Sequence, residues 1–254
     1  MDTPYVVVPP AGGPRSDAPV VIAYHLLDFP NNERAFAAAV PLDGLDAWKV
    51  YLGLPLSGAR TPAGGLWPLL MDDAVLKVHQ HVVFGALAEL PEAFAAVKDR
   101  YGIADGTPLG VLGGSMGGAA AHLVIAESGL DIRAAVLINP VVQFRDSIDG
   151  IAAHHGGSYA WSPASDEVAA RLDFVARAED IGHAAIRYVV GADDMVDAIL
   201  APVDRVVARL PRADLRVVPD MAHAVADEDE AAPRTPQAKI VDGLAVDWFR
   251  KHLS

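Results

Sequence analysis

Short runs of β-branched residues alternate with longer alanine-rich segments along this chain, and the alternation limits the folds that it can adopt. The short runs have the length of buried strands, whereas the alanine-rich segments place apolar residues at helical spacing. Strands that alternate with helices form βα units, which build a mostly parallel sheet with helices on both faces. The pattern therefore predicts an α/β protein with the architecture of a three-layer α/β/α sandwich.

The predicted strands lie at 20–25, 48–52, 109–113, 134–138, 186–191 and 215–218. The predicted helices lie at 33–40, 73–101, 116–128, 165–178, 196–210 and 236–252. Pro91 falls inside the longest of these helices. We expect a break there, because proline lacks a backbone N–H and clashes with the preceding turn.

Two stretches of the chain are too long for simple connections between strands and helices. One is 55–72, which is rich in glycine and proline, and the other is 141–182, which joins two predicted strands. Long insertions at one edge of a sheet are commonly binding loops or lids. We expect a single domain over 1–254, since 254 residues fit one α/β domain, with a small cap and a lid insertion at about 141–182.

The charge balance and the residue types exclude several classes of function. The chain has 20 basic and 33 acidic residues, and the resulting net charge of -13 repels nucleic acids and anionic membranes. The absence of cysteine excludes disulfides, thiolate metal sites and cysteine catalysis. The sequence shows no secretory signal and no apolar stretch of the roughly 20 residues that cross a bilayer, so we expect a cytoplasmic protein.

A glycine cluster separates the predicted strand at 109–113 from the helix that follows it. Gly113, Ser115 and Gly117 form a G-x-S-x-G pattern within the cluster. A serine at such a strand-to-helix turn sits on strained backbone, and the flanking glycines let strand and helix approach closely. The turn exposes the Ser115 hydroxyl at the helix N-terminus, where the Met116 N–H and the helix dipole can stabilise a developing oxyanion.

Two other interpretations of the glycine cluster explain less. A flexible glycine loop accounts for neither the strand before the cluster nor the helix after it. A phosphate-binding loop needs a Lys-Ser or Lys-Thr pair after its glycines, or a G-x-G-x-x-G pattern, and this cluster has neither. Nucleophilic catalysis by Ser115 is therefore the better hypothesis.

Serine is a weak nucleophile at neutral pH and needs a base that an acid holds in place. Asp193 and Asp194 follow the predicted strand at 186–191, and His223 lies in the loop after the strand at 215–218. The aspartates could instead cap the next helix, and the histidine could be a solvated loop residue. All of them nevertheless follow the carboxyl ends of strands, where open α/β sheets bind ligands. This coincidence favours catalysis, with either aspartate as the acid.

These motifs together resemble the α/β-hydrolase superfamily, and its esterase-like branch in particular. They are the runs Gly113-Gly114-Ser115-Met116-Gly117-Gly118 and Gly191-Ala192-Asp193-Asp194-Met195-Val196, followed by His223. The resemblance covers nearly the whole chain and implies the chain order nucleophile, acid, base. In this family a pattern like G-x-x-D-x-x-V follows the strand that carries the acid. Counted from Gly191, the pattern implies that Asp194 is the acid, with Asp193 and Asp197 as alternatives.

The resemblance also implies a second oxyanion donor besides the Met116 amide. The family carries a His-Gly turn after its third strand, and the residues after that histidine donate the second N–H. Here His25 ends a predicted strand and is followed by Leu26 and Leu27, without the glycine. The implied donor is the amide of Leu26 or Leu27, and the missing glycine is expected to restrict the acyl side of the pocket.

The expected function is that of a serine hydrolase that cleaves carboxylic esters of small to medium apolar acyl groups through an acyl-enzyme on Ser115. Its partner would be a small-molecule ester, and no cofactor is needed. The alternatives are an acyltransferase or peptidase with the same triad, or a catalytically silent ligand-binding protein of this fold.

The remaining aromatic residues and histidines have no single predicted role. Phe144 and Trp161, in the longer insertion, either line an apolar substrate pocket or pack the lid. His154 and His155 are adjacent, and His79 and His81 lack the spacing of four that puts two ligands on one helix face, so we expect no metal site. The oligomeric state is not predicted.

Overall fold

The computed structural model describes residues 3–227 and 234–253, and a sheet of seven strands forms the centre of this part of the chain. The strands are β1 (Tyr5–Val8), β2 (Val20–Tyr24), β3 (Trp48–Leu52), β4 (Leu109–Gly114), β5 (Ile132–Ile138), β6 (Ala185–Gly191) and β7 (Ala213–Val218). They lie in the order β1-β3-β2-β4-β5-β6-β7. Neighbours pair in parallel except at the edge, where β1 pairs antiparallel with β3. The predicted parallel sheet is confirmed.

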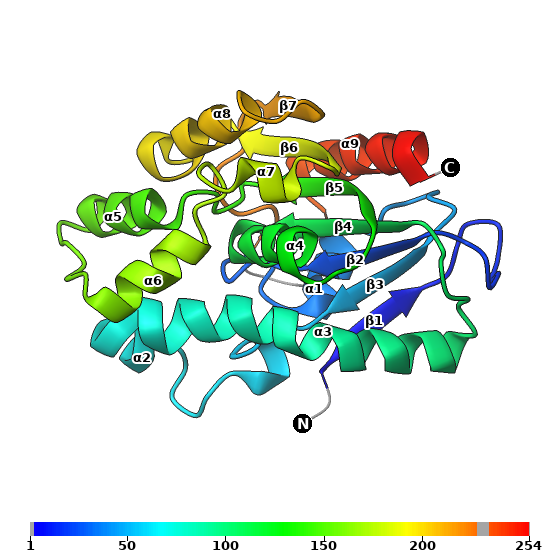
Figure 1. The fold of residues 1–254 in the computed structure, drawn as a ribbon, viewed down its shortest axis with the longest axis horizontal. Helices are drawn as coiled ribbons and strands as arrows, with labels where there is room; N and C mark the ends of the chain where they lie inside the picture. The colour runs from blue at the N-terminus through cyan, green and yellow to red at the C-terminus, as the bar shows by residue number, and fades with distance from the viewer. Residues whose placement is uncertain (1–2, 228–233, 254) are drawn as a thin grey trace.

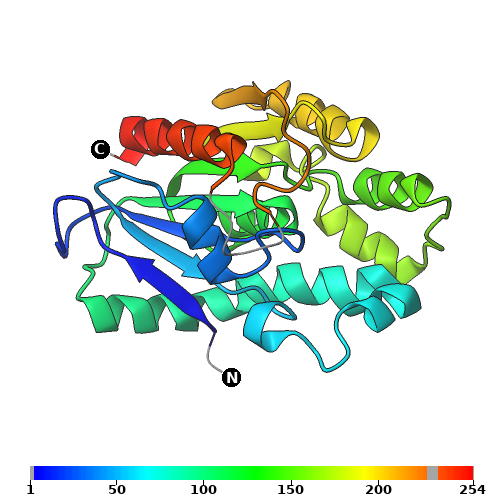
Figure 2. The same ribbon diagram turned by 180° about the vertical axis from the view of Figure 1, so that it is seen from behind.

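Helices cover both faces of the sheet, which makes the predicted three-layer sandwich (Figure 1). One face carries α3 (Gln80–Tyr101), α4 (Ser115–Glu127), α7 (Ala178–Ile181) and α8 (Ala201–Val207). The other face carries α1 (Glu33–Ala39) and α9 (Pro236–Leu253), which lie in front when the molecule is seen from behind (Figure 2). None of the helices in 3–227 and 234–253 combines the length and hydropathy of a membrane span.

The two helical layers explain why the central strands β2 and β4 are continuous apolar runs rather than alternating ones. Every residue of β2 is buried. Because side chains alternate across a strand, Val20 and Ile22 enter the core under α3 and α4, whereas Val21 and Ala23 enter the core under α1 and α9. A strand between two apolar layers has no solvent-facing side and can carry apolar residues throughout.

The remaining helical segments lie in the two long stretches of the chain or follow them. The first holds a 3₁₀ turn, η1 (Gly58–Arg60), and most of α2 (Trp67–Asp73), which leads into a π-helical segment, η2 (Ala74–His79). The second holds α5 (Phe144–His154) and α6 (Pro163–Arg171), and a further π-helical segment, η3 (Val196–Leu200), precedes α8. Helices α2, α5 and α6 lie beyond the carboxyl ends of the strands (Figure 1). A hydrogen bond of 2.7 Å from the Tyr159 hydroxyl to Asp73 joins the second stretch to the end of α2. Whether 141–182 acts as a lid remains a prediction.

The expected break at Pro91 is wrong, because α3 is continuous from Gln80 to Tyr101. A proline inside a helix removes one hydrogen bond and crowds the preceding turn. Pro91 itself is exposed on α3. Its neighbours Leu90 and Phe94 are buried in the core, and the burial of that face outweighs one lost hydrogen bond.

The helix predicted at 165–178 is wrong in its second half, since α6 ends at Arg171. The Asp173 carboxylate accepts hydrogen bonds from the backbone N–H groups of Val175 and Ala176 at 3.1 and 2.9 Å. An aspartate that bonds the backbone just after itself offers an alternative to the helical pattern. The chain therefore turns here before α7 begins.

Asp242 links α9 to the segment after α1, and its loss should destabilise the fold. Its buried carboxylate accepts the Leu42 N–H at 2.6 Å and lies 3.2 Å from the Arg234 guanidinium. Asp242→Ala leaves the Leu42 N–H without this acceptor, which should lower the free energy of unfolding by about 1–3 kcal/mol in urea titrations. Asp247→Ala, exposed on the same helix, is the control and should stay within about 0.5 kcal/mol of wild type. Equal effects of the two substitutions would contradict the assignment.

Candidate active site

Ser115 stands at the junction of β4 and α4 with a φ of +50°, in the left-handed region that non-glycine residues rarely adopt. This is the strained strand-to-helix turn that the G-x-S-x-G pattern predicts. Such conformations cost free energy and persist only where the surroundings impose them. The turn places the Ser115 hydroxyl at the first position of α4, with the Met116 amide next to it.

Gly117 allows the first turn of α4 to pack directly against the end of β2. A Cβ atom at this position would lie 2.2 Å from the carbonyl oxygen of His25 and 2.4 Å from that of Tyr24. Both obstacles are backbone atoms of a buried strand end, so neither can move aside easily. The glycine therefore joins the turn that holds Ser115 to the strand that leads to His25.

The structure brings Ser115, His223 and Asp194 together in one chain of hydrogen bonds. His223 Nδ1 lies 2.8 Å from Asp194 Oδ2, and His223 Nε2 lies 2.8 Å from Ser115 Oγ. A carboxylate can only accept, so Nδ1 carries the proton and Nε2 is free to accept the serine hydroxyl. The two neighbouring aspartates considered as alternatives, Asp193 and Asp197, are exposed.

Asp194 is held in an orientation that suits this contact. Its side chain is fully buried, and its second oxygen, Oδ1, accepts the Met195 N–H at 2.7 Å. The His223 side chain is 21% exposed, so one side of the imidazole reaches solvent. Such a set can move the serine proton to the imidazole and hold the resulting positive charge against the buried carboxylate.

His25 orients the peptide that follows it and remains neutral. The Leu54 N–H donates to His25 Nε2 at 3.0 Å, so the proton is on Nδ1, which donates to the Leu26 carbonyl at 2.5 Å. Burial lowers the pKa of His25 to about 4, although the bond to Leu26 acts in the opposite direction. At neutral pH this histidine is therefore a fixed, uncharged hydrogen-bonding group.

The backbone contacts separate the two candidates for the second oxyanion donor. The Leu26 N–H donates to the Pro30 carbonyl at 3.3 Å, so it is already engaged. In the part of the chain that the structure describes, no such partner is found for the amides of Leu27 and Met116. Leu27 is thus the better candidate, and its role and that of Met116 remain predictions.

Phe144 and Trp161 both pack against neighbouring side chains. Phe144 is fully buried, and its ring meets that of His79 edge-on with centroids 5.7 Å apart. The Trp161 indole N–H donates to Asp149 at 2.8 Å, and the Arg145 guanidinium lies 3.9 Å from the Trp161 ring centroid. That these two residues also line a substrate pocket remains a prediction.

Asn139 is a residue of this region that the sequence analysis does not single out. It directly follows β5, has a φ of +42° and is fully buried. Its side chain contacts the loop that carries His223 and the end of the strand that leads to Asp194. An Asn-Pro pair at a strand end, between the strands of two candidate residues, is the signal that could have identified it.

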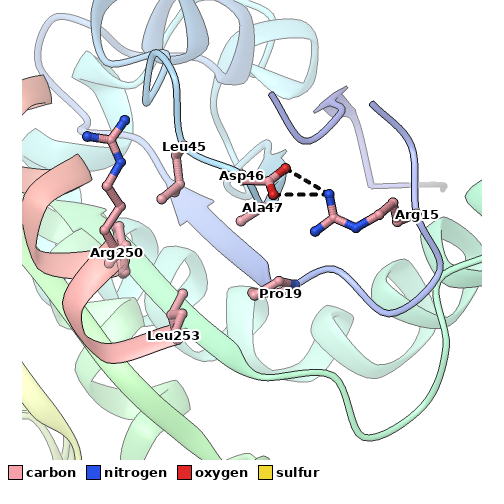
Figure 3. Close-up of a pocket in the computed structure, with 8 residues that line it drawn as sticks. Arg15, Pro19, Leu45, Asp46, Ala47, Arg250 and Leu253 are labelled. Atoms are coloured by element: carbon pink, nitrogen blue, oxygen red, sulfur yellow. Dashed lines mark hydrogen bonds and ion pairs between the residues drawn. The ribbon is translucent and has the colours of Figure 1, made fainter. Parts of the chain in front are cut away.

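A pocket of about 230 Å³ lies near the amino ends of the strands, whereas Ser115 and Asp194 follow their carboxyl ends. It is lined in part by Pro19, Leu45 and Ala47, near the amino ends of β2 and β3 (Figure 3). The Arg15 guanidinium lies 3.0 Å from both carboxylate oxygens of Asp46, so these two charges neutralise each other. This pocket is distinct from the site around Ser115.

Comparisons with known proteins place the chain by its fold. Neither a protein-family model nor a curated protein sequence matches it. TT1662 from Thermus thermophilus matches 100% of this chain with 99% of its own, at a TM-score of 0.66 and 15% identity. The match with a soluble variant of monoglyceride lipase from Saccharomyces cerevisiae covers 98% of this chain and 92% of that protein, at a TM-score of 0.64 and 14% identity.

A third solved structure, an esterase from Pyrobaculum calidifontis, matches 98% of this chain with 84% of its own, at a TM-score of 0.62 and 15% identity. Together with the sheet order and the helical layers, these matches show that the chain has the α/β-hydrolase fold. A fold of this kind hosts many reactions, so the chemistry has to be argued from the site.

Gly117→Ala should disrupt the turn that holds Ser115. The new methyl group would overlap two backbone carbonyl oxygens, so we expect the free energy of unfolding to fall by about 1–3 kcal/mol in urea titrations. Gly243→Ala, in α9, is the matched control, because an added Cβ there meets open space within the described chain. This control should gain roughly 0.5–1 kcal/mol from helix propensity. A Gly117→Ala protein as stable as wild type would refute the close contact.

Proposed function

We propose that this protein is a serine hydrolase that cleaves carboxylic esters of small to medium apolar acyl groups. The observation that carries the proposal is the hydrogen-bond chain from Ser115 through His223 to Asp194, with both distances at 2.8 Å. Structures of the same fold bear the names of a monoglyceride lipase and an esterase, which supports ester substrates at the level of fold analogy.

The reaction follows from the proton positions in this chain. Ser115 Oγ attacks the acyl carbonyl carbon while its proton passes to His223 Nε2, and the buried Asp194 carboxylate stabilises the imidazolium. The carbonyl π electrons move to oxygen, and the amides of Met116 and Leu27 donate to the oxyanion. Collapse of the intermediate breaks the bond to the alcohol, which leaves with the proton from His223. Water then hydrolyses the acyl-enzyme by the same steps.

The alternatives differ from ester hydrolysis at single steps. An acyltransferase would pass the acyl group to an alcohol or amine instead of water, and a peptidase would expel an amine. A ligand-binding protein without turnover would lack an activated serine. The absence of the glycine expected at this turn supports acyl groups of limited size, because Leu27, the residue that would carry the second oxyanion amide, brings a side chain there.

Ser115→Ala tests the nucleophile. The wild type should react with a fluorophosphonate probe at Ser115 and hydrolyse p-nitrophenyl esters of graded chain length, whereas the variant should do neither. Loss of a triad serine lowers kcat on the order of 10⁶-fold in a well-studied protease. The melting temperature should change little, and Ser158→Ala, at an exposed position within 141–182, should behave as wild type.

Several outcomes would redirect or reject this proposal. Probe labelling with ester turnover that requires an added alcohol would point to acyl transfer, and cleavage of aminoacyl anilides to a peptidase. Absence of labelling in a folded wild-type protein would reject the activated serine. Ester turnover by Ser115→Ala at the wild-type rate would place the reaction elsewhere.

Asp194→Asn tests the acid separately. The amide would hydrogen-bond the wrong imidazole tautomer, and the same replacement in a serine protease lowers kcat about 10⁴-fold. We expect a loss of several orders of magnitude in ester turnover with the fold retained. Asp193→Asn and Asp197→Asn are matched controls close to Asp194 in the chain and should lose far less, since both residues are exposed. If Asp193→Asn or Asp197→Asn lost ester turnover while Asp194→Asn stayed active, the acid would be that other aspartate.

A further inference from the structure

Asn139 occupies a central position at the carboxyl edge of the sheet. It directly follows β5, and β5 pairs with β4 on one side and β6 on the other. Those two strands lead to Ser115 and Asp194. The Asn139 side chain therefore starts between the strands of the proposed nucleophile and acid, in a fully buried position.

The Asn139 carboxamide is engaged at both ends. Its Nδ2 donates to the backbone carbonyls of Ala222 and His223, each at 2.9 Å, and its Oδ1 accepts the Gly191 N–H at 2.7 Å. Two donors on nitrogen and an acceptor on oxygen match these three backbone groups, which sets the orientation of the amide. One side chain thus spans the loop after β7 and the end of β6.

The two loops also touch each other directly. The Asp193 N–H donates to the Met221 carbonyl at 3.0 Å, and a Cβ atom on Gly191 would lie 2.1 Å from the same oxygen. The loops that hold the acid and the base are therefore packed backbone against backbone. His223 itself lies in neither a helix nor a strand, so its position depends on such contacts.

The backbone of Asn139 explains why this residue type suits the position. Its φ of +42° lies in the left-handed region, which asparagine adopts more readily than most residues. Its own N–H continues the sheet by donating to the Val189 carbonyl at 2.9 Å. The conformation turns the side chain out of the strand pattern, so an amide is needed that tolerates this φ and supplies both donors and an acceptor.

We propose that Asn139 is a positioning residue that fixes the His223 backbone relative to the Asp194 loop. It acts through these loops and does not touch the reacting atoms. This inference rests on the proposed function, because it assigns Asn139 to the alignment of the proposed base and acid. A displacement of about 1 Å in such an alignment can cost 10²-fold in rate.

Two substitutions remove the contacts without forcing the backbone out of its conformation. Asn139→Gly deletes the side chain and tolerates positive φ. Asn139→Asp keeps the shape and the acceptor for the Gly191 N–H, but it presents an oxygen to the two carbonyls that now receive N–H groups. With p-nitrophenyl esters, both variants should lose about 10²-fold in kcat while KM stays near the wild-type value.

Tyr51→Phe is the matched control for the loss of a buried hydrogen bond. The Tyr51 hydroxyl is fully buried and donates to the Val40 carbonyl at 2.7 Å, in the core under α1 and α9. The control should unfold at a lower urea concentration yet retain kcat. Folded Asn139 variants that also retain kcat would show a purely structural role and overturn the proposal.

Proton NMR gives a readout that needs no turnover. The His223 Nδ1–H bound to Asp194 should give a downfield resonance in wild type and Tyr51→Phe, and this resonance should weaken or broaden in the Asn139 variants. An unchanged resonance in both variants would overturn the positioning role. Because the resonance is present whether or not esters are cleaved, this result is separable from failure of the proposed function, which probe labelling of Ser115 reports.

The wild-type protein provides a test should both Asn139 variants fail to fold. With ¹⁵N-labelled asparagine, the two Asn139 carboxamide protons should exchange with solvent far more slowly than those of Asn31, whose side chain is partly exposed. Exchange as fast as that of Asn31 would show that the contacts to the His223 loop do not persist in solution, and would reject the proposal.

Discussion

The parallel pairing of β4, β5, β6 and β7 is the constraint on which the rest of the site depends. Because these strands run in one direction, their carboxyl ends reach the same edge of the sheet. Ser115, Asn139, Asp194 and His223 follow these four strands in turn, although the first and the last are separated by 108 residues. No helix or loop could gather them without that register. The sheet is itself stabilised by apolar layers on both faces, so the strand ends that lead to the site are held by the core.

Histidines in this protein differ in role because their surroundings differ. Burial lowers the pKa of His25 to about 4 and that of His122 to about 3, so both stay uncharged at neutral pH. His25 fixes a peptide at the strand end, and His122 stacks on Phe174 with ring centroids 4.6 Å apart. His223 instead has a carboxylate on one nitrogen, a hydroxyl on the other and partial exposure. Only this last environment suits repeated proton transfer.

Much of the fold was predictable because local patterns and tertiary packing agree. Most of the predicted strands are buried on both faces and have a distinct composition, and each predicted strand is present. β1 was not predicted: its four residues are only half-buried and lie at the edge, so long-range pairing with β3 decides their conformation. Packing also decides the conformation at Pro91, where the burial of one face of α3 overrides a local rule. At Asp173 the cause is local, because its side chain accepts hydrogen bonds from the backbone that follows and so competes with the helix.

The sequence by itself determined the α/β architecture, the turn at Ser115, and a short set of aspartates and a histidine at strand ends, since each has a local signature in residue type and spacing. The tertiary structure decided which aspartate meets His223, because the direction of a side chain in a loop depends on the backbone packed around it. It also decided that the Leu26 amide is engaged and that Asn139 spans two loops. These contacts join residues far apart in the chain, and local sequence patterns carry no information about such pairs.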